Sequence, residues 1–247
     1  MSSKYVNEIT LPSKGILYDE SLKIPEKITI RAMTTKEEKM LLGSTSDAIN
    51  DIIENCIEKP SGIKVDELIS ADVTNILVDL RVLTYGPEYK MFFICEACNK
   101  KNTISIDLTE LYNRLLNDDF TEPIEIKLPR SGDVLEVKLL RGKDFKAVDK
   151  WAKVVEKRTK ASNLKGDVAY TLRMAKYIKT INKEEVDSES ALAYVEEMIG
   201  MDSAHFWKTI NDIQMGYDIN LTRDCMQCGH ENEFVMPITA EFFRPSS

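Results

Sequence analysis

Four cysteines in two Cys-x-x-Cys pairs are the residues of this chain best suited to chemistry. The pairs are Cys95/Cys98 and Cys225/Cys228. Four thiolates on two tight turns supply the tetrahedral sulfur shell that a structural zinc ion requires. Because the pairs lie about 130 residues apart, one shared ion would join two distant parts of the chain. The sequence therefore predicts one structural Zn²⁺ bound by all four cysteines.

The residues around each pair predict a β-hairpin with the cysteines at its tip. After each pair, apolar residues alternate as in a half-buried strand, at Ile104, Ile106 and Leu108 and at Phe234, Met236 and Ile238. Asn99 and Gly229 directly follow the two pairs. Both residue types accept a positive φ, which turns backbone N–H groups toward sulfur.

Other uses of the cysteines fit the sequence less well. Without a signal-peptide pattern or an apolar run of about 18 residues, we expect a soluble cytosolic protein, in which structural disulfides are rare. A thioredoxin-like redox pair begins a helix, whereas these pairs lie between predicted strands. A catalytic zinc keeps an open coordination position and usually has a histidine ligand, whereas four thiolates close the coordination shell. We expect His230 to be a solvated residue of the hairpin, although it could also be an alternative ligand or hydrogen-bond to a ligand. We expect Cys56 to be a buried free thiol.

The two cysteine pairs occupy corresponding points of an internal repeat. The matching segments are Ile9–Gly15 with Ile126–Gly132, Ile69–Asp72 with Ile199–Asp202, and Gly86 with Gly216. The later matches share the offset of about 130 residues seen for the cysteines. We therefore predict two halves, residues 1–120 and 121–247, related by a pseudo-two-fold axis near the metal.

Each half reads as a strand pair, then helices, then a zinc-knuckle β-hairpin, which predicts an α+β fold. Strands are expected at residues 27–31 and 135–141. Helical periodicity covers Val65 to Leu83, Leu172 to Ile178 and Leu192 to Ile199. The boundary between halves is expected near residues 118–123, and a helix–helix loop at residues 158–166.

Composition limits the function classes. The chain has 247 residues, 43% apolar and 30% charged, with a net charge of −8, so it can bury a core but presents an acidic surface. Nucleic-acid binding requires clustered basic residues. The eight basic residues from Lys143 to Lys165 are interspersed with acids and read better as a solvated helix face.

Signals for an enzyme are weak. The chain has two histidines and lacks a Gly-rich phosphate loop and the hydrolase and metalloprotease motifs. Asp118 and Asp119 adjoin each other, so their side chains point apart and make a poor acid/base pair. In His205-Phe206-Trp207, the aromatic residues are expected to pack and His205 to lie at the surface. An enzyme with a structural zinc remains an alternative, as does a zinc-ribbon protein that binds nucleic acid.

Three segments resemble a known family. Leu11–Tyr18 followed by Ile28–Glu38 looks like the "PS-G-x-x-Y … v-R-p-l-T-x-x-E" start of the T-even-type bacteriophage base plate proteins. Asp79–Tyr89 is similar to the family segment that leads into a cysteine knuckle, and Cys225 with Cys228 matches its second knuckle.

The resemblance implies a non-enzymatic protein of contractile-tailed phages that acts in the baseplate hub, as a component or as an assembly factor. Its partners would be other baseplate or tail hub proteins, without membrane or nucleic acid. It would occur in the cytoplasm of the bacterial host during assembly, and in the virion tail if it is retained. The Leu11–Tyr18 arm and its copy at Leu128–Gly132 are expected either to contact partners or to cover the core of their own half.

Overall fold

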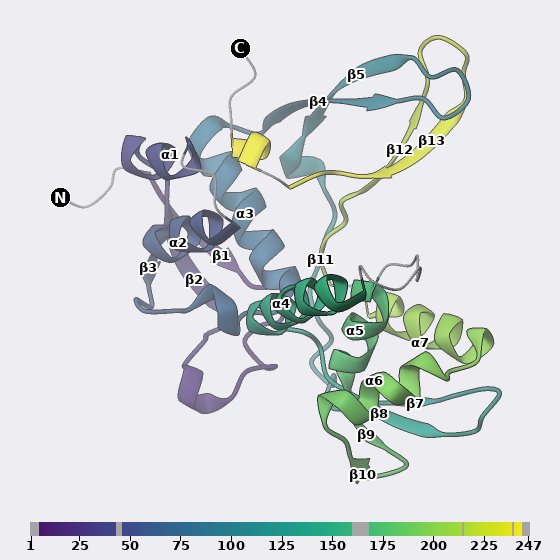
Figure 1. The fold of residues 1–247 in the computed structure, drawn as a ribbon. Coiled ribbons are helices and arrows are strands. Elements are labelled where there is room, and N and C mark those ends of the chain that lie inside the picture. The colour runs from purple at the N-terminus through teal and green to yellow at the C-terminus, as the bar shows by residue number, and fades with distance from the viewer. Residues whose placement is uncertain (1–4, 43–45, 160–167, 214, 239, 244–247) are drawn as a thin grey trace. The chain divides into compact units, whose positions relative to one another are not determined.

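The computed structural model describes residues 5–42, 46–159, 168–213, 215–238 and 240–243. Helices and several small antiparallel sheets alternate along the chain, in agreement with the predicted mixture of helix and sheet (Figure 1). The chain forms two compact units. Unit 1 comprises residues 1–65, 71–116 and 215–247, and unit 2 comprises residues 66–70 and 117–214. Within the described residues, no helix is both long and apolar enough to cross a membrane.

Unit 1 begins with an antiparallel sheet of order β1-β2-β3. Its strands are β1 (Val6–Thr10), β2 (Lys27–Arg31) and β3 (Ile57–Lys59), and its helices are α1 (Thr35–Leu42), α2 (Ser46–Cys56) and α3 (Ser70–Tyr85). Ile28 and Ile30 of β2 are fully buried, as are Ile53 of α2 and Ile76 of α3. The three helices lie beside this sheet (Figure 1), and these side chains belong to the buried apolar interior.

Three strand pairs complete unit 1. They are β4 (Glu88–Ile94) with β5 (Lys101–Asp107), β6 (Asn113–Arg114) with β11 (Gly216–Tyr217), and β12 (Asn220–Asp224) with β13 (Glu231–Val235). Short 3₁₀ turns occur at η1 (Glu20–Leu22), η2 (Val65–Glu67), η3 (Leu108–Glu110) and η4 (Ala240–Phe243). The last strands of the chain thus belong to the unit built by its first half, so the compact units differ from the halves 1–120 and 121–247.

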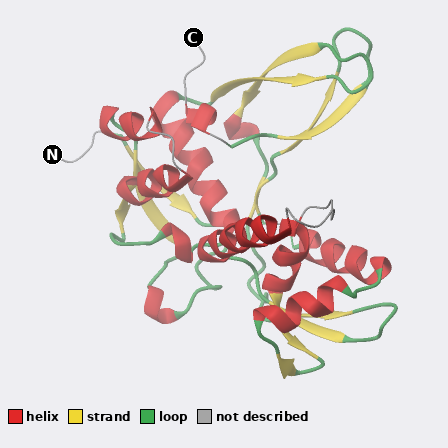
Figure 2. Ribbon diagram, in the orientation of Figure 1, coloured by secondary structure: helices red, strands yellow, loops and turns green. Residues whose placement is uncertain are grey.

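Unit 2 contains a four-stranded antiparallel sheet of order β10-β9-β8-β7. Its elements are β7 (Ile124–Lys127), β8 (Val134–Val137), α4 (Gly142–Thr159), α5 (Val168–Tyr177), β9 (Ile178–Ile181), β10 (Glu184–Glu185), α6 (Ser188–Glu196) and α7 (Gly200–Asp212). Helix α5 packs against α4 and α6. One core joins the sheet to α5, α6 and α7 (Figure 2), with Leu135, Met174, Val195 and Phe206 among its buried members.

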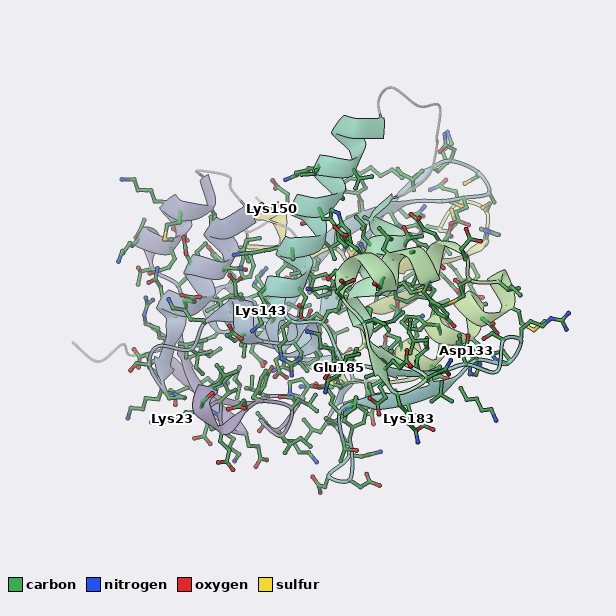
Figure 3. The ribbon with its side chains drawn as sticks, turned by 60° about the horizontal axis from the view of Figure 1, so that its bottom comes forward. Lys23, Asp133, Lys143, Lys150, Lys183 and Glu185 are labelled. Atoms are coloured by element: carbon green, nitrogen blue, oxygen red, sulfur yellow. The ribbon has the colours of Figure 1, made fainter. Side chains whose placement is uncertain are left out.

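The turns at the open end of this sheet are tied together by polar side chains. Figure 3 shows Asp133 and Lys183, which follow β7 and β9 at neighbouring turns. Asn182 donates its amide to Asp133 Oδ1 at 2.8 Å, and the Tyr194 hydroxyl donates to Asp133 Oδ2 at 2.7 Å. Asp133 therefore holds two turns and helix α6 in one arrangement.

Most of the predicted elements are present, with two differences. Strand β2 covers the predicted residues 27–31, whereas the second predicted strand, residues 135–141, ends at Val137. A register shift at Glu136/Val137 ends the pairing there, and the Arg141 N–H instead donates to Asp144 at the start of α4. Ile178 was predicted to be helical and begins β9. The predicted loop at residues 158–166 lies largely outside the described residues.

The first Leu-Pro arm is part of the interior of unit 1. Leu11 and Ser13 are fully buried. The Ser13 N–H and hydroxyl donate to the Asp72 carboxylate at 2.9 and 2.5 Å, and the Tyr18 hydroxyl donates to it at 2.6 Å. These residues of the arm therefore lie in the core of unit 1, as in the second of the two expected roles.

The second Leu-Pro segment is held in a similar way but has an exposed tip. Asp202 accepts the N–H groups of Arg130 and Ser131 at 2.7 and 3.0 Å, and Leu128 is buried. Pro129, Arg130 and Ser131 are exposed. In both segments a buried aspartate from the first turn of a helix satisfies the turn that follows a strand.

Glu37 fixes the start of α1. Its fully buried carboxylate accepts bonds from Arg31 Nη2 at 2.9 Å and from the Thr34 N–H at 2.9 Å, an arrangement typical of a capping box. Burial by itself would raise the pKa of Glu37. The hydrogen bonds from Arg31 and Thr34 outweigh burial and lower the pKa from 4.5 to about 2.

We predict that Glu37→Gln lowers the stability of the protein at neutral pH. A pKa lowered from 4.5 to about 2 corresponds to about 3 kcal/mol of unfolding free energy, present above pH 4.5 and lost as the pH falls toward 2. Denaturant unfolding at several pH values measures this. The variant should be less stable at pH 7 and lose less stability than the wild type between pH 4.5 and 2.

Glu8→Gln is the matched control, because Glu8 pairs with Lys27 at 3.6 Å on the exposed surface. Its unfolding free energy should stay within about 0.5 kcal/mol of the wild-type value. Equal losses for the two variants would contradict the role of Glu37.

Candidate metal centre

The two cysteine pairs lie at the tips of the predicted hairpins. The tip of β4–β5 carries Cys95 and Cys98, and the tip of β12–β13 carries Cys225 and Cys228. Each tip closes in the same way: the Cys95 N–H donates to Lys100 O at 2.9 Å, and the Cys225 N–H donates to His230 O at 2.8 Å. The hairpin prediction is confirmed for both pairs.

Each tip also contains the predicted left-handed residue. Asn99 has a φ of 55° and Gly229 a φ of 70°. Their N–H groups donate to Cys95 O and Cys225 O, both at 2.9 Å. Positive φ at these positions turns the chain sharply enough for both sulfurs of a pair to face the same side.

The two tips bring all four sulfur atoms together. The Sγ atoms of Cys95, Cys98, Cys225 and Cys228 lie within 4.8 Å of one another. The Cys95 and Cys228 sulfurs are 3.7 Å apart, and those of Cys98 and Cys225 are 3.6 Å apart. Sulfurs bound tetrahedrally to zinc at about 2.3 Å are about 3.8 Å from each other. The cluster therefore has the dimensions of a four-thiolate metal site.

The cysteines of this cluster shift one another's pKa values. Burial acts to raise the pKa of Cys225, but the N–H groups of Gln227 and Cys228 and the amide of Asn102 lower it. The Lys100 N–H acts to lower the pKa of Cys98, but burial and the neighbouring cysteines raise it. Like charges this close cannot all form unless a cation compensates them. The arrangement can thus hold a positive ion.

Two buried asparagines connect the tips. Asn102 of β5 accepts the Met226 N–H at 2.9 Å, and Asn232 of β13 accepts the Glu96 N–H at 3.0 Å. The Phe93 and Phe234 rings stack between the hairpins with centroids 4.8 Å apart. We did not predict the asparagines, although the sequence holds a signal for them, since Asn102 and Asn232 each lie seven residues beyond the first cysteine of a pair.

Other predicted residues take ordinary places. Cys56 is a fully buried free thiol, as predicted, and burial raises its pKa to about 12. His230 is exposed and is outside the group of possible ligands among the described residues. Phe206 is buried and Trp207 packs against it at 5.4 Å, which confirms their predicted role in packing. His205 is half-buried.

The second hairpin is anchored to the rest of unit 1 beyond its tip. Strand β11 pairs with β6, and the Tyr217 hydroxyl donates to Asp79 of α3 at 2.9 Å. Arg81 of α3 donates from Nε to Phe242 O at 2.9 Å. These bonds connect α3 to the segments before and after the second hairpin.

One family description matches nearly the whole chain. The sequence model described as "T4 bacteriophage base plate protein" matches residues 4–244. No curated protein and no solved structure matches the chain. The match includes both hairpins and both Leu-Pro segments, so it covers every element described above. On this evidence, the chain belongs to the T4 bacteriophage base plate protein family.

Proposed function

We propose that this protein is a non-enzymatic component or assembly factor of the baseplate hub, built around one structural Zn²⁺. Family membership supports a baseplate role, with other phage tail proteins as partners. The observation that carries the proposal is the convergence of four cysteine sulfurs, from two hairpins distant in the sequence, within 4.8 Å.

The ligands of the proposed zinc are Cys95, Cys98, Cys225 and Cys228. Four sulfurs favour zinc or another thiophilic ion over calcium or magnesium, which prefer oxygen ligands. Four protein thiolates also complete the tetrahedral shell, so no position remains for water or substrate. The bound ion would supply positive charge that stabilises the thiolates and joins the two hairpins. This chemistry supports a structural role.

We infer that the two halves, residues 1–120 and 121–247, are diverged copies of one ancestral unit. The order strand, strand, helix, helix, strand occurs in both, in β1–β3 and in β7–β9. Asp72 and Asp202 hold equivalent turns, and Gly86 and Gly216 share a φ of 85°. The second copy contributes its hairpin to unit 1, so each copy differs from a compact unit.

A zinc-ribbon protein that binds nucleic acid has less support. The predicted basic stretch begins on α4, where Figure 3 shows Lys143 and Lys150. Lys143 donates to Glu67 at 2.5 Å, and Lys146 donates to Asp66 at 2.9 Å. Charges neutralised by neighbouring acids contribute little to phosphate binding.

The exposed tip of the second Leu-Pro segment is our candidate contact with another tail protein. Its backbone is held by Asp202, while Pro129 and Arg130 are exposed. A rigid backbone with exposed side chains can bind without a large cost of ordering. During assembly this contact would form in the host cytoplasm, and it would persist in the virion tail if the protein is retained.

We predict that each chain binds one zinc ion. Native mass spectrometry should detect one metal per wild-type chain, and none in Cys98→Ser or Cys225→Ser. Each substitution should lower the unfolding free energy by about 3 kcal/mol or more, because the ion closes a loop of about 130 residues. Cys56→Ala is the control and should keep the metal, since Cys56 lies outside the cluster. Wild-type protein purified without metal, or with two ions, would exclude the shared site.

We further predict that Arg130→Glu weakens binding to tail proteins. Tagged protein from phage-infected cells should recover fewer tail proteins when Arg130 is reversed in charge. The thermal midpoint should stay unchanged, because Asp202 accepts the backbone N–H of residue 130, which the substitution keeps. Lys127→Glu, also exposed and on adjacent β7, is the control. Unchanged recovery would remove the tip as a contact. Salt-sensitive recovery of DNA or RNA in place of tail proteins would favour the nucleic-acid alternative.

A further inference from the structure

The two buried asparagines at the hairpin tips form a reciprocal arrangement. Asn102 and Asn232 are each 3% exposed, although asparagine is usually found at the surface. Each extends from the strand after its own cysteine pair and reaches the tip of the other hairpin. Buried side-chain amides of this kind are expected to be fully hydrogen-bonded.

The oxygen of each amide binds the opposite hairpin. Asn102 Oδ1 accepts the N–H of Met226 at 2.9 Å, and Asn232 Oδ1 accepts the N–H of Glu96 at 3.0 Å. Met226 and Glu96 each directly follow the first cysteine of a pair. By binding the N–H of the residue next to a cysteine, each amide oxygen fixes the position and orientation of that cysteine's sulfur.

The nitrogen of each amide binds the asparagine's own tip. Asn102 Nδ2 donates to Lys100 O at 3.0 Å, and Asn232 Nδ2 donates to His230 O at 2.7 Å. The two asparagines then differ in one contact. Asn102 Nδ2 also donates to Cys225 Sγ at 3.4 Å, whereas Asn232 Nδ2 reaches Arg223 O at 3.4 Å.

We propose that Asn102 and Asn232 are positioning residues, a reciprocal pair of side-chain bridges that sets the register of the two hairpin tips and so assembles the four-sulfur site. The expected effect on zinc affinity rests on the proposed metal site. The bridges themselves need no ion, because five of their six hydrogen bonds involve backbone atoms. Asn102 has a second effect, because it also donates to a ligand sulfur.

The first test compares Asn102→Ala and Asn232→Ala with a control, Asn220→Ala. Asn220 is an exposed residue of β12 whose side chain donates to Asp218 at 3.0 Å, away from the tips. Zinc affinity is measured by competition with a chromophoric chelator, and the site is inspected by its Co²⁺ absorption. Both bridge variants should bind at least about tenfold more weakly, the usual effect of removing a group that orients metal ligands. Asn102→Ala should also shift the sulfur-to-cobalt charge-transfer band, and Asn232→Ala should shift it less. Affinities within about threefold of the wild type in both folded bridge variants would overturn the proposal.

The second test needs no metal. Metal-free protein is oxidised with excess oxidised glutathione, which takes two electrons and two protons from each thiol pair and is reduced to glutathione. The disulfides are then mapped by peptide mass spectrometry. In the wild type, Cys95–Cys228 and Cys98–Cys225 should dominate, because these sulfurs are 3.7 and 3.6 Å apart. In the bridge variants, disulfides within each pair should dominate instead. The same pattern in wild type and variants would overturn the proposal even if the protein proved to bind no metal.

If a variant does not fold, amide hydrogen exchange on the metal-free wild type still tests whether the bridges form. The N–H groups of Glu96 and Met226 should exchange at least about tenfold more slowly than those of the exposed tip residues. Unprotected exchange at both would mean that the bridges do not form in solution. A failure of zinc binding with protected amides would reject the metal site and leave the bridges in place.

Discussion

The docking of two hairpin tips against each other is the constraint on which unit 1 depends. The C-terminal strands must return to a unit whose helices α1 to α3 and other strands precede residue 117, and they do so along β11, β12 and β13. Such a return costs loop-closure entropy, which is offset by the contacts of β11 and of Tyr217 and by those made where the hairpins meet. The stacked Phe93 and Phe234 rings, the asparagine bridges and the four sulfurs are all located at this meeting point.

The same principle of burying a satisfied polar group recurs away from the cysteines. Asp72, Glu37 and Asp202 are each buried and each accept hydrogen bonds from a turn or a helix start. A buried carboxylate is costly unless its partners are in place, so each group favours one local conformation over its alternatives. For a protein whose proposed role is to present surfaces to other baseplate proteins, a single rigid conformation reduces the cost of association.

The proposed function follows from the kind of site that the chain can build. A closed sulfur shell suits a metal that stabilises structure, since it leaves no position for substrate. Membership of the base plate protein family, which rests on residues 4–244, separately supports a role in the phage baseplate. The two lines of evidence together favour a protein that acts through its contacts.

The amino-acid sequence by itself determined the local features of this protein. Spacing and residue type were enough to locate both hairpin tips, the positive φ of Asn99 and Gly229, and strand β2, because these depend on neighbouring residues alone. Sequence pattern did not locate the end of β8 at Val137, where a register shift stops the pairing. Only the tertiary structure decided that residues 215–247 join unit 1, and that Asn102 and Asn232 bind across the tips. Such contacts join residues more than a hundred positions apart, and local propensity carries no information about partners that distant.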